Sequence, residues 1–104
     1  QVLINLIRNA ADAVPEERRA QIVLSIDETE SDAVIRVVDN GRGVRAKVAE
    51  RLFEPFFTTK GGQGLGLGLD ISRKIIAAHG GQIDLESTSD QGTTFRVSLP
   101  LASK

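Results

Sequence analysis

Apolar side chains recur at helical spacing through the first fourteen residues of the chain. At 100° per residue, one stripe collects the apolar positions Leu3, Leu6, Ile7, Ala10 and Val14. Pro15 follows, and proline ends a helix because it lacks the backbone N–H and clashes with the preceding turn. The spacing therefore predicts an amphipathic helix over residues 1–14.

The opposite stripe of this helix is polar. Asn5, Asn9 and Asp12 follow one another at spacings of four and three, with Arg8 beside them. A solvated helix face explains most such stripes. Asparagine, however, is a weaker helix former than Glu, Lys or Gln, so two asparagines favour a second interpretation, a stripe that faces a ligand.

Further along the chain, apolar and polar residues alternate as they do in strands with one buried face. The predicted strands cover residues 21–27, 33–39, 82–87 and 93–99, and the other predicted helices cover residues 45–52 and 69–79. A short polar turn joins the first two strands, which predicts a hairpin. One-sided alternation favours an antiparallel sheet that carries its helices on one face. The expected fold class is therefore α+β, a two-layer α/β sandwich in one domain over residues 1–104.

Composition and charge narrow the function classes. The 104 residues fit one domain, and the net charge of −1 leaves no basic excess for nucleic-acid binding. The absence of cysteine excludes disulfides and thiolate chemistry, and no apolar run approaches the roughly 20 residues of a membrane span. We therefore expect a cytoplasmic domain. Because the chain opens inside the helical pattern, we also expect a piece of a longer protein, cut close to or within its first helix.

The second predicted strand ends in a carboxylate and a glycine turn. Asp39 follows the β-branched run of residues 34–38, and Asn40-Gly41 then forces a turn because glycine adopts positive φ at little cost. A carboxylate beside backbone that glycines leave open can receive the amino group of a ligand. Taken alone, the pattern is also that of an ordinary turn.

Closely spaced glycines precede the last predicted helix. Gly62, Gly64 and Gly66 leave backbone N–H groups available at the positive end of that helix, which is the arrangement that holds phosphate. The spacing matches neither GxxxxGK[ST] nor a GxGxxG that follows a strand, and a flexible hinge is the alternative. Asn9 offers a neutral oxygen of the kind that Mg²⁺ accepts when phosphate oxygens complete its shell.

Taken together and in this order, these stretches resemble the sequence boxes of the GHKL ATPases, the group of gyrase, Hsp90, MutL and the sensor histidine kinases. The similar segments are residues 5–10 (N box), 39–43 (G1 box), 62–66 (G2 box) and 92–95 (final G box). Residues 51–60 resemble the F box of histidine kinases, in the version typical of nitrogen-regulation and oxygen-sensing sensors. The resemblance covers nearly the whole chain and implies the Bergerat ATP-binding fold.

The resemblance also implies a site for ATP and Mg²⁺. Asp39 would accept a hydrogen bond from the adenine amino group, with Gly43 and Thr93 completing the base pocket. Asn9 would coordinate Mg²⁺ and Lys60 would neutralise the γ-phosphate, which makes these two the implied catalytic residues. The whole implied nucleotide site consists of Asn5, Arg8, Asn9, Asp39, Gly41, Gly43, Lys60, Gly62, Gly64, Leu65, Gly66 and Thr93. Residues 44–63 would form a lid over the nucleotide, and Phe53 and Phe57 would either anchor this lid or dock on the partner domain.

Sensor kinases pass the γ-phosphoryl group of ATP to a histidine on a separate dimerisation domain and then to a response regulator. The resemblance implies that the chain works with these two partners and that its parent protein is a homodimer. It implies no binding of nucleic acid. His79 is the only histidine, and Gly80 follows it where a phosphoacceptor is followed by an acidic residue. We interpret His79 as a partly buried residue that closes a helix, and we expect the chain to bind ATP without phosphorylating itself.

Two positions help to decide between this function and the alternative functions within the same group of ATPases. Some family members carry Lys one turn after the magnesium asparagine, where this chain has Asp12, so a phosphate-binding role is not expected there. Gyrase-like hydrolases use a Glu in the N box to activate water, and this chain has Asn5 instead, which argues against hydrolysis. The alternatives are an ATP-hydrolysing machine or anti-sigma-type serine kinase of the same group, and a degenerate nucleotide-binding module that only docks.

Overall fold

The computed structural model describes residues 2–54 and 68–101 of the chain. Within these ranges the elements are α1 (Val2–Ala13), β1 (Ile22–Glu28), β2 (Asp32–Asp39), α2 (Ala46–Ala49), α3 (Leu69–Ala78), β3 (Gln82–Ser89) and β4 (Gly92–Pro100). Each predicted element is present, and the largest difference is in α2, which ends earlier than expected. The predicted α+β class is confirmed.

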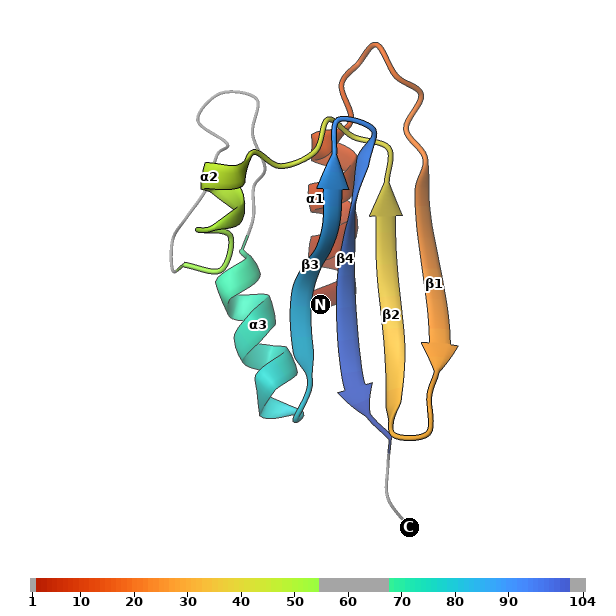
Figure 1. Cartoon of the computed structure of the whole chain (residues 1–104), viewed down its shortest axis with the longest axis vertical. Coiled ribbons are helices and arrows are strands. Elements are labelled where there is room, and N and C mark those ends of the chain that lie inside the picture. Colours follow the sequence, from red (N-terminus) through yellow and green to blue (C-terminus); the bar gives the residue numbers. More distant parts are fainter. Residues whose placement is uncertain (1, 55–67, 102–104) are drawn as a thin grey trace.

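The strands form one antiparallel sheet in the order β1-β2-β4-β3. The predicted hairpin joins β1 to β2, and Ile35 of β2 lies opposite Ile26 on one side and Val97 on the other. The two longer helices, α1 and α3, cover the same face of this sheet (Figure 1). The sheet and this helical layer make the expected two-layer sandwich.

The core lies between the sheet and its helices. Its fully buried side chains, each less than 2% exposed, are Leu6, Leu52, Leu69, Ile83, Val37 and Val97. They come from α1, from the segment after α2, from α3 and from strands β2, β3 and β4, so the core joins both longer helices to three of the strands. Truncating such a leucine to alanine typically costs about 2–5 kcal/mol, which is a large share of a small domain's stability.

Three details of the burial pattern differ from the sequence prediction. Helix α1 is rotated about its axis, so that Asn9 is only 3% exposed whereas Ile7, predicted to be buried, is 38% exposed. On the edge strand β1, Ile26 is 68% exposed, because α1 packs mainly over β2. His79 caps the C-terminus of α3 as predicted but is exposed rather than partly buried. Periodicity finds these elements without telling which neighbour each one packs against.

Candidate functional site

The carboxylate of Asp39 lies at the C-terminal end of a central strand. Asp39 pairs with Ile22 of β1 on one side and with Thr93 of β4 on the other. It shares the helix-facing side of β2 with Val37, because alternate residues of a strand point the same way. Only 6% of Asp39 is exposed. The chain thus places a carboxylate inside the protein at the end of the sheet.

Two backbone N–H groups hold this carboxylate. Gly41 donates to Asp39 Oδ1 at 2.8 Å, and the backbone of Thr93 donates to the same carboxyl group. Burial raises the pKa of Asp39 above its ordinary value of 3.8, and the two N–H groups only partly offset this effect. An ionised carboxylate offers about four lone-pair sites, so two donors leave room for others. Asp39 is therefore suited to receive a further donor.

Threonines line the strand side of this carboxylate. Thr93 is 3% exposed, and its Oγ1 lies 2.8 Å from Oγ1 of Thr88 on β3. The backbone N–H of Val44 donates to the same Thr88 oxygen at 2.8 Å. The pair therefore ties the segment after the glycine turn to β3 and β4.

The glycine turn fits closely between α1 and the β3–β4 turn. Gly41 is buried, and the N–H of the next residue, Arg42, donates to the carbonyl of Ala13 at the end of α1 at 3.1 Å. Gly43 has a φ of +84°, and a Cβ there would overlap the carbonyl oxygen of Ser89. Only glycine meets both conditions at position 43 without strain.

The two asparagines of α1 lie in different surroundings. Asn9 is buried on the inner side of the helix, one turn before Ala13 and the glycine turn. Asn5 donates through Nδ2 to the carbonyl of Gly68 at 3.2 Å and to Oγ of Ser72 at 3.1 Å. Asn5 therefore links α1 to the N-terminus of α3. This is the helix end at which the sequence predicts that phosphate binds.

The other implied site residues divide into two groups. Arg8 is exposed on α1, next to Asn9 in sequence. Lys60, Gly62, Gly64, Leu65 and Gly66 lie outside the described residues, as does the predicted lid anchor Phe57. The other predicted anchor, Phe53, is half-buried, with the guanidinium of Arg73 on α3 lying 4.1 Å from its ring centroid. The base of the predicted lid thus rests on α3.

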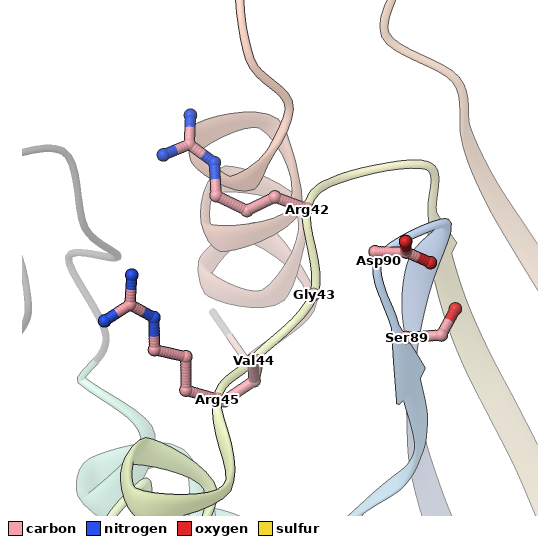
Figure 2. A pocket seen from close by; sticks show the side chains of 6 residues that line it. All are labelled: Arg42, Gly43, Val44, Arg45, Ser89 and Asp90. Atoms are coloured by element: carbon pink, nitrogen blue, oxygen red, sulfur yellow. The ribbon is translucent and has the colours of Figure 1, made fainter.

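A pocket of about 380 Å³ lies beside the glycine turn. Its lining residues are Arg42, Gly43, Val44, Arg45, Ser89 and Asp90. In Figure 2 the side chains of Arg42 and Arg45 extend to the same side, away from Ser89 and Asp90. The pocket shares Gly43 with the implied base pocket but does not include Asp39 or Thr93, so it adjoins the carboxylate site rather than containing it.

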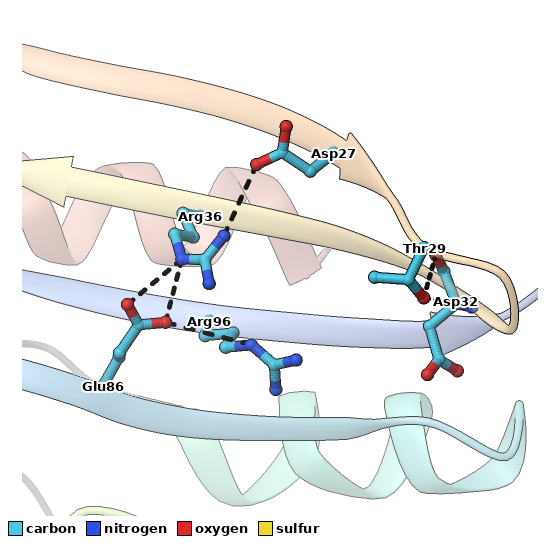
Figure 3. Close-up of polar contacts among 6 residues, drawn as sticks. All are labelled: Asp27, Thr29, Asp32, Arg36, Glu86 and Arg96. Carbon is cyan, nitrogen blue, oxygen red and sulfur yellow. Dashed lines mark hydrogen bonds and ion pairs between the residues drawn. The ribbon is translucent and has the colours of Figure 1, made fainter.

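Charged residues gather on the opposite face of the sheet, away from the helices (Figure 3). Arg36 Nε lies 2.9 Å from Oε1 of Glu86, and the Arg36 guanidinium lies 3.5 Å from Asp27. Arg96 lies 3.9 Å from the same Glu86 carboxylate. These partly exposed pairs keep the outer face solvated, and each is worth at most about 1 kcal/mol.

Two further kinds of site were sought among the described residues, a metal-binding cluster of side chains and a membrane-spanning helix. Among residues 2–54 and 68–101, no three His, Cys, Asp or Glu side chains gather into a metal-binding group. No helix within these ranges has the length and apolar character needed to cross a membrane.

Sequence reasoning missed four residues around the site. Gly68 is the N-cap of α3 and has a left-handed backbone conformation. Ser72 accepts a hydrogen bond from the Asn5 side chain. The Thr88 hydroxyl is hydrogen-bonded to the Thr93 hydroxyl and accepts from the N–H of Val44. Arg18, in the loop after α1, donates to the carbonyls of the glycine turn. Gly68 was recognisable as a glycine at the start of a predicted helix. The other three look like ordinary surface residues in the sequence, since only the fold shows what they bind.

The chain matches a known family over almost its whole length. The profile of the histidine kinase-, DNA gyrase B- and HSP90-like ATPases matches residues 1–103. The sensor protein FixL of Bradyrhizobium diazoefficiens is 45% identical over 103 residues, which make up 98% of this chain and 20% of FixL. The C4-dicarboxylate transport sensor protein DctB of Rhizobium meliloti is also 45% identical, over 98% of this chain and 16% of DctB. The chain thus spans about a fifth or less of these two relatives.

Solved structures of histidine kinases share the fold. The nucleotide-free catalytic domain of histidine kinase ThkA superposes with a TM-score of 0.81 at 40% identity, covering 96% of this chain and 64% of that domain. ThkA in complex with the response regulator protein TrrA gives a TM-score of 0.77 at 35% identity, covering 98% of this chain and 28% of the kinase. The chain therefore belongs to the family of histidine kinase-, DNA gyrase B- and HSP90-like ATPases and is, within it, a catalytic domain of the sensor histidine kinase type.

Proposed function

We propose that the chain holds Mg·ATP with the adenine at Asp39 and donates the γ-phosphoryl group to a histidine on a separate dimerisation domain. The observation that carries the proposal is the buried carboxylate of Asp39, held by two backbone N–H groups and adjoined by Thr93. A buried charge with spare acceptor capacity is costly unless a ligand donor meets it.

This carboxylate suits adenine rather than guanine. Adenine presents an amino group at the position where guanine presents a carbonyl oxygen. An ionised acceptor attracts the first and repels the second, and a charge-assisted hydrogen bond is worth about 1.5–3 kcal/mol. Asp39 therefore supplies base selectivity, with Gly43 and Thr93 as neighbours in the pocket.

The residues of α1 suit a magnesium ion that takes most of its other ligands from phosphate oxygens and water. Mg²⁺ is commonly bound through one or two protein oxygens together with substrate phosphates and water. Asn9 supplies one neutral amide oxygen, one turn before the end of the helix that packs on the glycine turn. Magnesium would neutralise phosphate charge, whereas Asn9 would orient the ion and Arg8 would add positive charge nearby. Lys60 and the glycines at 62, 64 and 66 complete the proposed phosphate side.

Phosphoryl transfer asks the protein mainly to position and to neutralise charge. Water activation would require a carboxylate near the phosphates. Asn5, the residue at the place where hydrolases carry that group, is neutral, and its amide nitrogen donates to Gly68 and Ser72. This arrangement supports transfer to another molecule over hydrolysis.

The relatives support a proposal about the partners. FixL and DctB are named as sensor proteins, and ThkA was solved with the response regulator TrrA. We propose that this chain belongs to a homodimeric sensor of the nitrogen-regulation or oxygen-sensing type, on the cytoplasmic side. Its histidine would come from a dimerisation domain, because His79, which closes α3, is followed by Gly80 where a phosphoacceptor histidine is followed by an acidic residue.

A titration and a transfer assay test the proposal. With Mg²⁺ present, calorimetry should show saturable ADP binding and no GDP binding at the same concentrations. Labelled ATP should not label the chain itself but should label an added dimerisation domain that carries the phosphoacceptor histidine. Equal binding of ADP and GDP, or labelling of the chain alone, would contradict the proposal.

A further inference from the structure

One arginine outside the implied site joins the two turns that enclose it. Arg18 lies in the loop between α1 and β1 and is half-buried. Its Nη1 donates to the carbonyl oxygens of Asn40 and Gly41, both at 2.8 Å. Its Nη2 donates to the carbonyl oxygen of Asp90 at 3.0 Å. A single guanidinium thus binds three backbone carbonyls from two distant parts of the chain.

The two parts adjoin the residues of the proposed base pocket. Asn40 and Gly41 directly follow Asp39, and the N–H of Gly41 is itself a donor to that carboxylate. Asp90 lies in the turn between β3 and β4, just before the strand that supplies Thr93. Any change in the spacing of these turns would move the Gly41 N–H and the Thr93 N–H relative to one another, and with them the carboxylate that both groups hold.

Arginine is suited to this task because of its shape. Each terminal nitrogen carries two N–H groups in a rigid plane, so Nη1 can serve two neighbouring carbonyls while Nη2 reaches a third. Lysine carries its donors on a single nitrogen and cannot fix the separation of two turns in the same way. The loop that presents Arg18 is anchored as well, because the N–H of Gln21 donates to Oδ1 of Asn40 at 2.8 Å.

We infer that Arg18 is a positioning residue for adenine recognition: it fixes the distance between the Asn40-Gly41 turn and the β3–β4 turn and so aims Asp39 at the amino group. The inference rests on the proposed function. Arg18 touches neither base nor phosphate in this account, because its donors are directed at backbone carbonyls. Its loss should weaken the contact to the adenine amino group and leave the rest of nucleotide binding intact.

The test compares two nucleotides that differ only at the amino group. The full chain and its Arg18→Gln variant are titrated with Mg·ADP and with the Mg²⁺ complex of purine riboside diphosphate, in which hydrogen replaces the adenine amino group. Arg18→Gln is expected to weaken ADP binding roughly three- to tenfold, the effect of one imperfect hydrogen bond, and to change binding of the second nucleotide less than about twofold. Equal weakening of both nucleotides, or no weakening of either, would overturn the inference.

Two further variants make the result specific. Arg19→Gln removes the same charge from the adjacent exposed position and is expected to leave both affinities unchanged; an ADP-selective loss there would overturn the role given to Arg18. Arg18→Lys keeps the charge and covers the case in which Arg18→Gln does not fold. It should also lose ADP affinity selectively, and ADP binding equal to that of the parent chain would overturn the inference.

Asp39→Asn separates this inference from the proposed function. If Asp39→Asn leaves ADP affinity unchanged, the adenine site is elsewhere and both statements fall. If Asp39→Asn weakens ADP binding but Arg18→Gln and Arg18→Lys do not, only the role of Arg18 falls.

Discussion

Replacing Asp39 by asparagine removes one charge from the proposed adenine pocket while keeping the size of the side chain. Asp39 is 6% exposed, and burial raises its pKa. The folded state therefore disfavours the charge, and asparagine can still accept a hydrogen bond from Gly41 through its one carbonyl oxygen. We expect the variant to fold and to resist urea at neutral pH about as well as the parent chain, because removal of the disfavoured charge offsets the loss of one acceptor oxygen for the backbone N–H groups of Gly41 and Thr93.

The effect of Asp39→Asn on nucleotide binding should be a clear loss of affinity. A carboxylate has two acceptor oxygens, whereas asparagine has one oxygen and one NH₂ donor. The backbone N–H groups of Gly41 and Thr93 already donate to this side chain. The NH₂ group of the asparagine must therefore face another donor, which is either one of these N–H groups or the adenine amino group. Loss of a charge-assisted hydrogen bond of about 1.5–3 kcal/mol lowers affinity by about 10- to 150-fold.

Isothermal calorimetry with Mg·ADP measures this loss, and urea unfolding measures stability in the same samples. Asp84→Asn is the matched control, because Asp84 is an exposed carboxylate on β3. Its ADP affinity should equal that of the parent chain. An Asp39→Asn variant that folds and binds ADP as tightly as the parent chain would refute the reasoning, and so would an equal loss in both variants.

Four other outcomes are expected. Asn9→Ala should weaken ADP binding more with Mg²⁺ than with EDTA in calorimetry, and equal loss in both would contradict its metal role. Because the pKa of Asp39 is raised, ADP affinity should fall as pH falls toward and through that pKa, above the ordinary 3.8, and Asp39→Asn should lack this drop. Gly43→Ala should lower the unfolding free energy by about 1–3 kcal/mol in urea, since φ is +84° there; an unchanged midpoint would contradict this. Glu86→Gln should cost at most about 1 kcal/mol, less in high salt, and a larger, salt-independent loss would contradict its partly exposed pairing with Arg36.

The elements of this fold could be predicted because their signals are local. Alternation along residues 33–39 and 93–99, and helical spacing along residues 69–79, each reflect one buried face of one element. The way elements pack is not local. Nothing in the sequence of α1 shows that it lies over β2. For this reason the sequence left open whether Asn9 faces solvent or a ligand, and it placed Ile7, which is exposed, on the apolar stripe.

The same distinction between local and non-local signals applies to the residues of the candidate site. Asp39 could be found because a carboxylate between a β-branched strand and a glycine turn is distinctive in sequence. Thr93 came only from the family resemblance. Arg18 could not be found, because it stands in a run of charged residues that looks like any solvated loop, and its three carbonyl partners come from residues 40, 41 and 90. Side chains that act on distant backbone leave no local pattern.

The central claim is that nucleotide binds at the end of the sheet, at the carboxylate of Asp39. Amide NMR spectra of the isotope-labelled chain, recorded during titration with Mg·ADP, test it most directly. We expect the largest shifts to include the amides of Gly41 and Thr93, which donate to Asp39, and the amides of Arg36 and Arg96 on the opposite face to stay unchanged. Saturable ADP binding that leaves the Gly41 and Thr93 amides unshifted would contradict it.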